Sequence, residues 1–182
     1  MAAPRALGID IGRVIISPGE SAGDTSFLHG SDDDAMHTRP SPDAFETIAA
    51  LVDAFEGRVW LVSKCGPNVE RRSRRWLGHH RFFEHTGVPG HQLRFCRKRP
   101  DKALICAELK LDAFIDDRTD VLAPMAGGVA WRYLFGPQRR PAPADLIPVL
   151  DWRAVGRHLL PLAREQALME QGAPRSVAAP SR

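Results

Sequence analysis

The sequence predicts an α/β protein, a Rossmann-like three-layer α/β/α sandwich built on a mostly parallel sheet of five strands. Short apolar runs alternate along the chain with longer amphipathic segments, which is the pattern of repeated βαβ units. Polar residues directly follow several of these runs, and open parallel sheets bind their ligands at such positions. The length of 182 residues suits one domain. We expect that domain to span residues 1–171 and a disordered tail to cover residues 172–182.

Five apolar runs account for the predicted strands. They cover residues 6–12, 58–63, 92–96, 111–116 and 128–135. In the last run Trp131, Tyr133 and Phe135 alternate along the chain, so we expect their side chains to share one face of the core.

The segments between these runs predict the helices. Residues 42–55, "PDAFETIAALVDAF", repeat apolar side chains at intervals of three and four, with Ser41 as a candidate N-cap and Pro42 in the first turn. Further helices are expected over residues 67–80, 99–109, 117–126 and 151–171, the last of them interrupted at Pro161.

Residues 17–39 fit neither element type. The segment is rich in Gly, Ser and Asp without a period, and it is longer than most loops that carry no function. Because it follows the first strand directly, we expect a flap loop over a site at the end of that strand. An ordered surface loop without a role is the alternative.

The composition limits the classes of partner. The chain is 43% hydrophobic and 26% charged, and no apolar run approaches the ~20 residues of a membrane helix. The N-terminus lacks the apolar stretch of a secretory signal, so we expect a cytoplasmic protein. The net charge of +3 suits anionic partners in general, and we interpret the basic run at residues 70–81 as a solvated helix face rather than a nucleic-acid interface. Three cysteines without CxxC spacing predict buried free thiols rather than disulfides or a zinc site.

Candidate functional residues gather at the carboxyl ends of the predicted strands. They are Asp10 after the first strand, Ser63 and Lys64 after the second, Lys102 near the start of the helix after the third, and Asp116 and Asp117 after the fourth. Adjacent carboxylates repel one another unless a cation or hydrogen-bond donors compensate them, so the Asp116–Asp117 pair indicates a cation site. Ser63 also suits a helix cap. Lys98 precedes Lys102 closely, and the sequence leaves open which of the two reaches the site.

These stretches resemble the motifs of the haloacid dehalogenase-like hydrolase superfamily between Leu7 and Leu122. The matching stretches are "LGIDIGRVI" with Asp10, "VWLVSK" with Ser63, "RPDKALI" with Lys102, and "AFIDDRTDVL" with Asp116 and Asp117. The resemblance implies a phosphatase in which Asp10 is the nucleophile and forms an aspartyl-phosphate. It implies that Ser63, Lys64 and Lys102 bind the phosphoryl group, and that Asp10, Asp116, Asp117 and the backbone carbonyl of Gly12 bind Mg²⁺.

Gly12 departs from the pattern of this superfamily. Its phosphatases usually carry a second aspartate at that position, which protonates the leaving group and later activates water. Glycine keeps the metal-binding carbonyl and removes the acid, and general acid–base catalysis is typically worth about 10² to 10⁴ in rate. Replacement acids in the predicted flap are Asp24, His29, Asp32, Asp33, Asp34 and His37. A substrate that carries its own acid, or that has a good leaving group, would need none of them.

Two other functions fit parts of the sequence. Loss of the acid at Gly12 suits a binding module that keeps the hydrolase fold without its activity. The stretch "GIDIG" also resembles the first phosphate motif of actin-like ATPases and sugar kinases, although those folds need two such domains and 182 residues do not house both. We expect a Mg²⁺-dependent phosphatase with a minimal cap, which leaves an open site for a large phosphorylated substrate or for a lid from a second subunit of a homo-oligomer.

Overall fold

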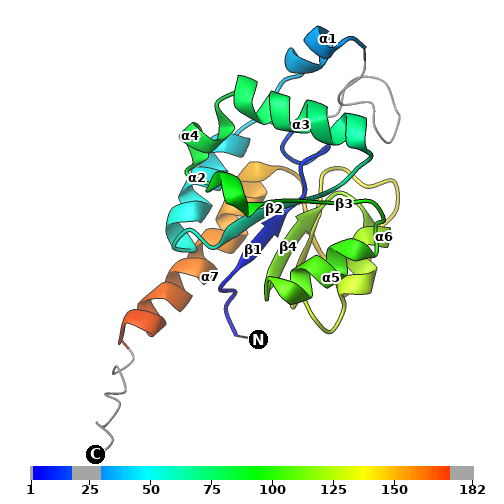
Figure 1. The fold of residues 1–182 in the computed structure, drawn as a ribbon. Coiled ribbons are helices and arrows are strands. Elements are labelled where there is room, and N and C mark those ends of the chain that lie inside the picture. The colour runs from blue at the N-terminus through cyan, green and yellow to red at the C-terminus, as the bar shows by residue number, and fades with distance from the viewer. Residues whose placement is uncertain (1, 18–29, 173–182) are drawn as a thin grey trace, which may run out of the picture.

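A computed structural model describes residues 2–17 and 30–172 of the chain (Figure 1). Its centre is a six-stranded sheet in the order β3-β2-β1-β4-β5-β6, in which every neighbouring pair is parallel. The strands are β1 (Leu7–Ile9), β2 (Val59–Lys64), β3 (Leu93–Cys96), β4 (Ala113–Asp116), β5 (Trp131–Phe135) and β6 (Ile147–Val149). The predicted α/β class is confirmed, but the predicted strand number of five is wrong. The sequence analysis missed β6 because it has three residues and Pro148 at its centre, which suits only an edge strand.

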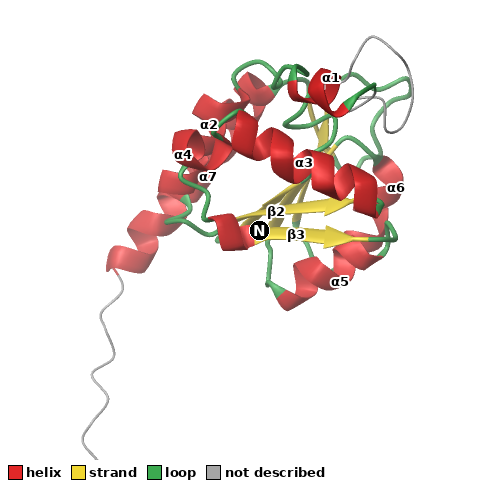
Figure 2. Cartoon of the chain, turned by 45° about the horizontal axis from the view of Figure 1, so that its top comes forward, coloured by secondary structure: helices red, strands yellow, loops and turns green. Residues whose placement is uncertain are grey.

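Helices cover both faces of this sheet, which confirms the three-layer sandwich (Figure 2). The helices are α1 (Asp32–Met36), α2 (Ala44–Ala54), α3 (Pro67–His79), α4 (Phe82–Thr86), α5 (Asp101–Glu108), α6 (Thr119–Leu122) and α7 (Trp152–Gly172), with short 3₁₀ turns at Gly90–Gln92 and Ala123–Met125. One apolar core joins β-strand side chains to α2, α3, α4 and α7, and a second joins the opposite face to α5 and α6. Tyr133 and Phe135 lie in the first core and Trp131 packs against it, as their alternation predicts.

The position of β1 explains where a ligand can bind. The strand order runs outward from β1 on one side to β2 and on the other to β4, so the chain changes direction at this point of the sheet. Open α/β sheets leave a crevice beyond the carboxyl ends of the strands at such a point. The middle of β1 must be glycine, because a Cβ atom at Gly8 would lie 2.4 Å from the ring of Phe114 on β4.

Two helix boundaries differ from the predicted ones. The helix predicted to begin after Ser41 begins at Ala44, and its N-cap is Asp43 with a φ of 59°. Ser41 instead donates its backbone N–H to Ile15, which ties this loop to the segment after β1. The last helix continues through Pro161, because Val155, Leu159 and Ala163 bury its inner face in the first core. That packing outweighs the hydrogen bond that proline removes.

The described part of the predicted flap lies against α3. Arg72 Nε donates to Asp32 at 2.9 Å, Trp76 Nε1 donates to the Thr38 carbonyl at 2.7 Å, and His80 Nε2 donates to the Met36 carbonyl at 2.9 Å. Within this segment, residues 32–36 form the short helix α1 rather than loop, with Ser31 as its N-cap. Asp24 and His29, within residues 18–29, lie outside the described residues, as does the predicted tail from residue 173 onward.

All three cysteines are free and buried, as predicted. Burial raises the pKa of the Cys65 thiol to about 11, so this cysteine is a neutral core residue at ordinary pH. Over residues 2–17 and 30–172, no helix combines the length and the apolar character that crossing a membrane requires.

Candidate active site

Three carboxylates converge at the carboxyl ends of β1 and β4. The parallel register places Ile9 beside Ile115, so Asp10 and Asp116 follow side by side, and the Asp10 N–H donates to the Ile115 carbonyl at 2.9 Å. Carboxylate oxygens of Asp10, Asp116 and Asp117 all lie within 4.8 Å of one another. The sheet topology therefore brings together acidic residues that are more than 100 positions apart in the sequence.

Lys102 of α5 contacts two of these carboxylates. Its Nζ lies 2.9 Å from Asp10 Oδ1 and 2.7 Å from Asp116 Oδ2, and the side chain is 2% exposed. The two carboxylates raise the pKa of the Lys102 ammonium despite the opposing effect of burial, so the group is a cation. Lys98, the alternative lysine, is exposed. The lysine in contact with the carboxylates is Lys102.

Of the basic side chains that line the cavity, Lys102 and Arg13 form ion pairs with the three carboxylates, so in these pairs two cations contact three anions. Arg13 Nε forms an ion pair with Asp117 at 2.8 Å, and the Arg118 N–H donates to Asp116 Oδ1 at 3.0 Å. Burial, together with the charge of Asp10, raises the pKa of Asp116 to about 7 and that of Asp117 to about 6. Both side chains therefore take up protons at a higher pH than ordinary aspartates do.

The donor set fits a magnesium ion. The buried Asp10 Oδ1 has its ion pair with Lys102, and no hydrogen bond of good geometry reaches it from the described residues. Mg²⁺ takes oxygen ligands and usually binds one or two protein carboxylates together with substrate and water. Asp10 and Asp116 offer such oxygens, with Asp117 beside them, and a divalent cation would supply the missing charge.

A cavity of about 60 Å³ opens beside these carboxylates. Gly12, Ser63 and Lys64 line it together with Asp10 and Lys102. Ser63 is buried near the end of β2 and is not a helix cap, because α3 begins after Gly66. Lys64 is exposed at the rim. The cavity suits a group of few atoms, such as a phosphoryl group.

Arg13 is a site residue that the sequence analysis did not find. Its φ of 62° lies in the left-handed region, which non-glycine residues seldom adopt. The turn is fixed on both sides, since Ile16 donates to the Ile11 carbonyl at 3.0 Å and Trp152 Nε1 donates to the Val14 carbonyl at 2.9 Å. No sequence signal marks Arg13 except its place four residues after the end of β1, because its partner Asp117 follows a different strand, β4.

None of the described candidate acids lines the cavity. Asp32 pairs with Arg72 and Arg75 of α3, and the Asp34 carboxylate accepts from Ser31 in the capping box of α1. Asp33 and His37 are exposed on and just after the same short helix. Within residues 2–17 and 30–172, the carboxyl groups that line the cavity beside Gly12 are those of Asp10, Asp116 and Asp117 alone.

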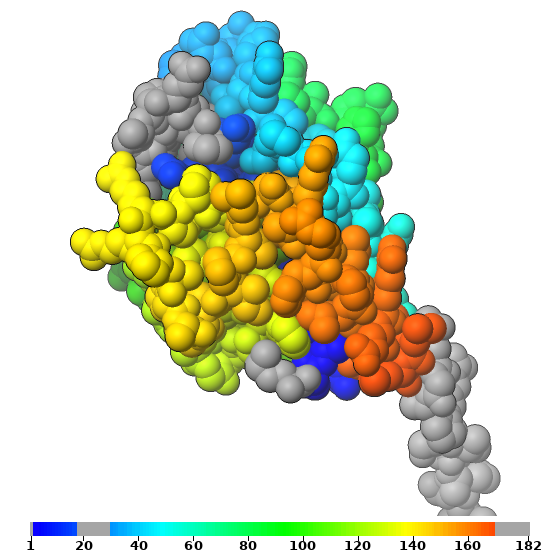
Figure 3. Space-filling view, turned by 180° about the vertical axis from the view of Figure 1, so that it is seen from behind, coloured from blue at the N-terminus to red at the C-terminus, as the bar shows by residue number. Residues whose placement is uncertain are grey.

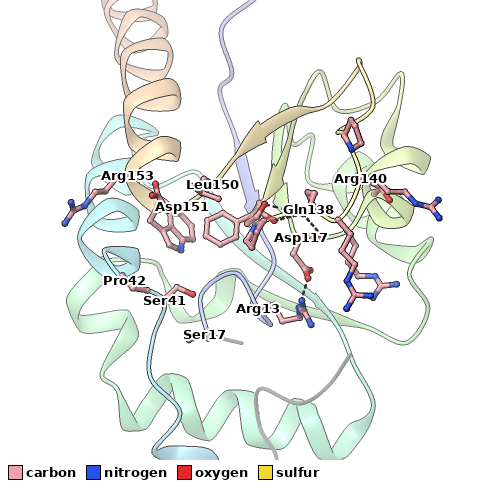
Figure 4. Close-up of a pocket in the computed structure, with 18 of the residues that line it drawn as sticks. Arg13, Ser17, Ser41, Pro42, Asp117, Gln138, Arg140, Leu150, Asp151 and Arg153 are labelled. Carbon is pink, nitrogen blue, oxygen red and sulfur yellow. Dashed lines mark hydrogen bonds and ion pairs between the residues drawn. The ribbon is translucent and has the colours of Figure 1, made fainter. Parts of the chain in front are cut away.

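A larger groove of about 1150 Å³ adjoins the cavity (Figure 4). Arg13, Asp117 and Arg118 line both spaces, so the two adjoin at these residues. The other walls of the groove are the loop over residues 136–143, residues 41–43 before α2, and the start of α7. Seen from behind, the stretch around residue 140 and the start of α7 lie side by side on one face of the molecule (Figure 3).

Comparisons with known proteins identify the fold. No protein-family model and no curated protein matches the sequence. The structure is similar to the crystal structure of a haloacid dehalogenase-like family hydrolase from Xanthomonas campestris, with a TM-score of 0.60 and 12% sequence identity over 92% of this chain and 100% of that chain. The chain has the fold of a haloacid dehalogenase-like hydrolase, which confirms the predicted resemblance at the level of the fold.

Proposed function

From this fold and the residues at its strand ends, we propose that the protein is a Mg²⁺-dependent phosphatase that acts through an aspartyl-phosphate on Asp10. The observation that carries the proposal is the meeting of Asp10, Asp116 and Asp117 with the buried Lys102 around a cavity of about 60 Å³. The solved neighbour is itself described as a hydrolase.

Mg²⁺ would be held by Asp10, Asp116 and the carbonyl of Gly12, with Asp117 as a further ligand. When bound, it supplies positive charge to the oxygens of the transferring phosphoryl group. The buried position of Asp10 keeps bulk water from the reacting oxygen until the substrate has bound.

Asp10, Lys102 and Ser63 have separate roles in the displacement at phosphorus. Asp10 attacks phosphorus, and the bond from phosphorus to the leaving oxygen breaks. Lys102, 2.9 Å from Asp10, orients that carboxylate, and the Ser63 hydroxyl donates to a phosphoryl oxygen. Water then attacks the phosphorus of the aspartyl-phosphate, which releases phosphate and restores Asp10.

Gly12 limits which substrates react. Without an acid at this position, the leaving oxygen must depart as a stable anion, and alkyl esters should react more slowly by about 10² to 10⁴ than with a general acid present. Aryl phosphates, acyl phosphates and anhydrides have leaving groups that need no proton. We expect the enzyme to prefer these classes.

A binding module on the same fold is the second candidate, and the absence of an acid beside Gly12 favours it. The test incubates purified protein with Mg²⁺ and aryl phosphates, acyl phosphates, nucleotides and sugar phosphates. Asp10→Asn should abolish turnover, while Asp53→Asn, at an exposed position of α2, should leave it unchanged. Absence of turnover above the Asp10→Asn background on every substrate would instead support the binding module.

A further inference from the structure

The large groove beside the catalytic cavity points to the substrate class. We propose that this groove receives the leaving part of the substrate and that this part is itself a phosphate, so that the enzyme cleaves a phosphoric anhydride such as a nucleoside diphosphate. The inference rests on the proposed phosphatase function. Its structural basis is that the two spaces adjoin, with Arg13, Asp117 and Arg118 in the lining of both.

The charged side chains that line the groove sum to one net positive charge, and two of its arginines have no ion pair with the described residues of the wall. Five arginines and four aspartates lie in its wall: Arg13, Arg118, Arg139, Arg140, Arg153, Asp43, Asp117, Asp120 and Asp151. Three of the arginines form ion pairs within the wall, namely Arg13 with Asp117, Arg118 with Asp120, and Arg153 with Asp43.

The three remaining charged residues of the wall differ in their contacts. Asp151 Oδ1 accepts the Ala154 N–H at the start of α7. Arg139 and Arg140 are exposed, and neither forms an ion pair with a residue that the structure describes. An anion in the groove would therefore find two arginines that no described carboxylate neutralises.

The loop that carries these arginines is tied to the site. Gln138 Nε2 donates to the Phe135 carbonyl at 2.9 Å and to the Asp117 carbonyl at 3.4 Å. Gly136, with a φ of 78°, turns the chain out of β5 just before it. Gln138 thus holds the start of the Arg139–Arg140 pair beside the carboxylate group, and Figure 4 shows Arg140 at the outer rim of the groove.

A phosphate leaving group needs no general acid, so it can depart although position 12 is a glycine. In the first step an Asp10 oxygen bonds to the terminal phosphorus, the bond to the bridging oxygen breaks, and its electron pair stays on the leaving phosphate. The last pKa of such a phosphate is about 6, so it departs as an anion without a proton. Arg139 and Arg140 would balance that charge.

The second step completes the hydrolysis. Water bonds to the phosphorus and the bond from phosphorus to Asp10 breaks. One proton of the water stays on the new P–OH group and the other passes to another oxygen of the released phosphate.

The groove also has room and apolar surface for an organic body. Its volume of about 1150 Å³ exceeds what a phosphate needs, and Leu150 in its wall is 65% exposed. Phe135 and Trp152, which also line the wall, are buried, so Leu150 is the large apolar side chain that the wall exposes. Leu150 would contact the base or sugar of a nucleoside, which inorganic pyrophosphate lacks.

A binding measurement tests this inference independently of turnover. Calorimetry with Mg²⁺ and a methylene-bridged nucleoside diphosphate, which is not cleaved, compares wild type with the double variant Arg139→Ala/Arg140→Ala. The matched control is Arg157→Ala/Arg164→Ala, which removes two exposed arginines of α7 outside the groove. We expect the groove variant to bind about five- to tenfold more weakly and the control to bind as wild type does. Equal affinity in the two double variants would overturn the inference.

A rate measurement separates failure of the inference from failure of the proposed function. Phosphate release is followed from a nucleoside diphosphate, from pyrophosphate and from p-nitrophenyl phosphate, with Asp10→Asn as the background. We expect kcat/KM to be highest for the nucleoside diphosphate and to fall in the groove variant for the two anhydrides only. Asp10-dependent cleavage of the aryl ester without preference for the anhydrides would overturn the inference and leave the phosphatase in place. If nothing is cleaved, the phosphatase and the cleavage of an anhydride both fail, and the calorimetry then tests only whether the groove binds an anhydride.

Discussion

We expect Mg²⁺ to stabilise the folded protein much more at pH 8 than at pH 5. Burial raises the pKa of Asp116 to about 7 and that of Asp117 to about 6, from ordinary values of 3.8. Between about pH 4 and pH 7 the folded protein therefore holds protons that the unfolded chain has released. Without metal, these two groups make the free energy of unfolding fall as the pH rises through that window.

Proton competition sets the size of the effect. A pH of 5 lies well below the raised pKa of Asp116, about 7, so a metal that needs the ionised carboxylate binds more weakly, by roughly 100-fold or about 3 kcal/mol. Asp117, about one unit below its pKa, adds up to roughly tenfold if it is also a ligand. At pH 8 both are mostly ionised, and a Mg²⁺ concentration of about 100 times Kd stabilises the fold by about 2.7 kcal/mol.

Urea unfolding with and without Mg²⁺ at pH 5 and pH 8 measures this difference. Asp116→Asn removes the negative charge of a proposed Mg²⁺ ligand. In this variant we expect Mg²⁺ to give neither the stabilisation nor its dependence on pH. Asp112→Asn, at a position outside the cavity, is the control. Equal stabilisation of the wild type at the two pH values, or full stabilisation of Asp116→Asn, would refute the reasoning.

Three further predictions concern single residues. Gly12→Asp should raise kcat/KM for alkyl phosphates relative to aryl phosphates by about 10² to 10⁴, because it restores a general acid; an unchanged ratio would mean that a proton donor is already present. Lys102→Met should lower the free energy of unfolding at pH 8 by about 3–5 kcal/mol, because it leaves buried carboxylates without their cation, and by less at pH 5, where Asp116 is protonated. Gly8→Ala should destabilise the fold by about 1–3 kcal/mol through its clash with Phe114, whereas Gly78→Ala, in open space on α3, should be neutral or stabilising in the same urea titration.

The strand ends could be predicted because their signals are local. An apolar run followed by a polar residue marks both the strand and the direction in which it ends, and parallel pairing then brings Asp10 and Asp116 to the same edge of the sheet. Burial of Lys102 against them depends only on the crossover from β3 to β4. Their roles in catalysis remain predictions that the experiments above test.

Other features depend on contacts between distant segments. Prolines such as Pro148 and Pro161 usually indicate irregular structure. The residues around Pro148 nevertheless form a strand because they pair with β5, and the helix around Pro161 continues because α7 packs on the core beneath it. Arg13 and the Arg139–Arg140 loop have no motif of their own. They become site residues only because Asp117 and Gln138 join them across the sheet.

Chemical trapping on Asp10 tests the central claim most directly. The protein is mixed with Mg²⁺ and a cleaved substrate, quenched during turnover and reduced with borohydride, which converts an aspartyl-phosphate into homoserine. We predict that peptide mapping will find homoserine at position 10 only in samples that received both Mg²⁺ and substrate. Turnover with Asp10 unmodified, or with the modification on another residue, would contradict the account.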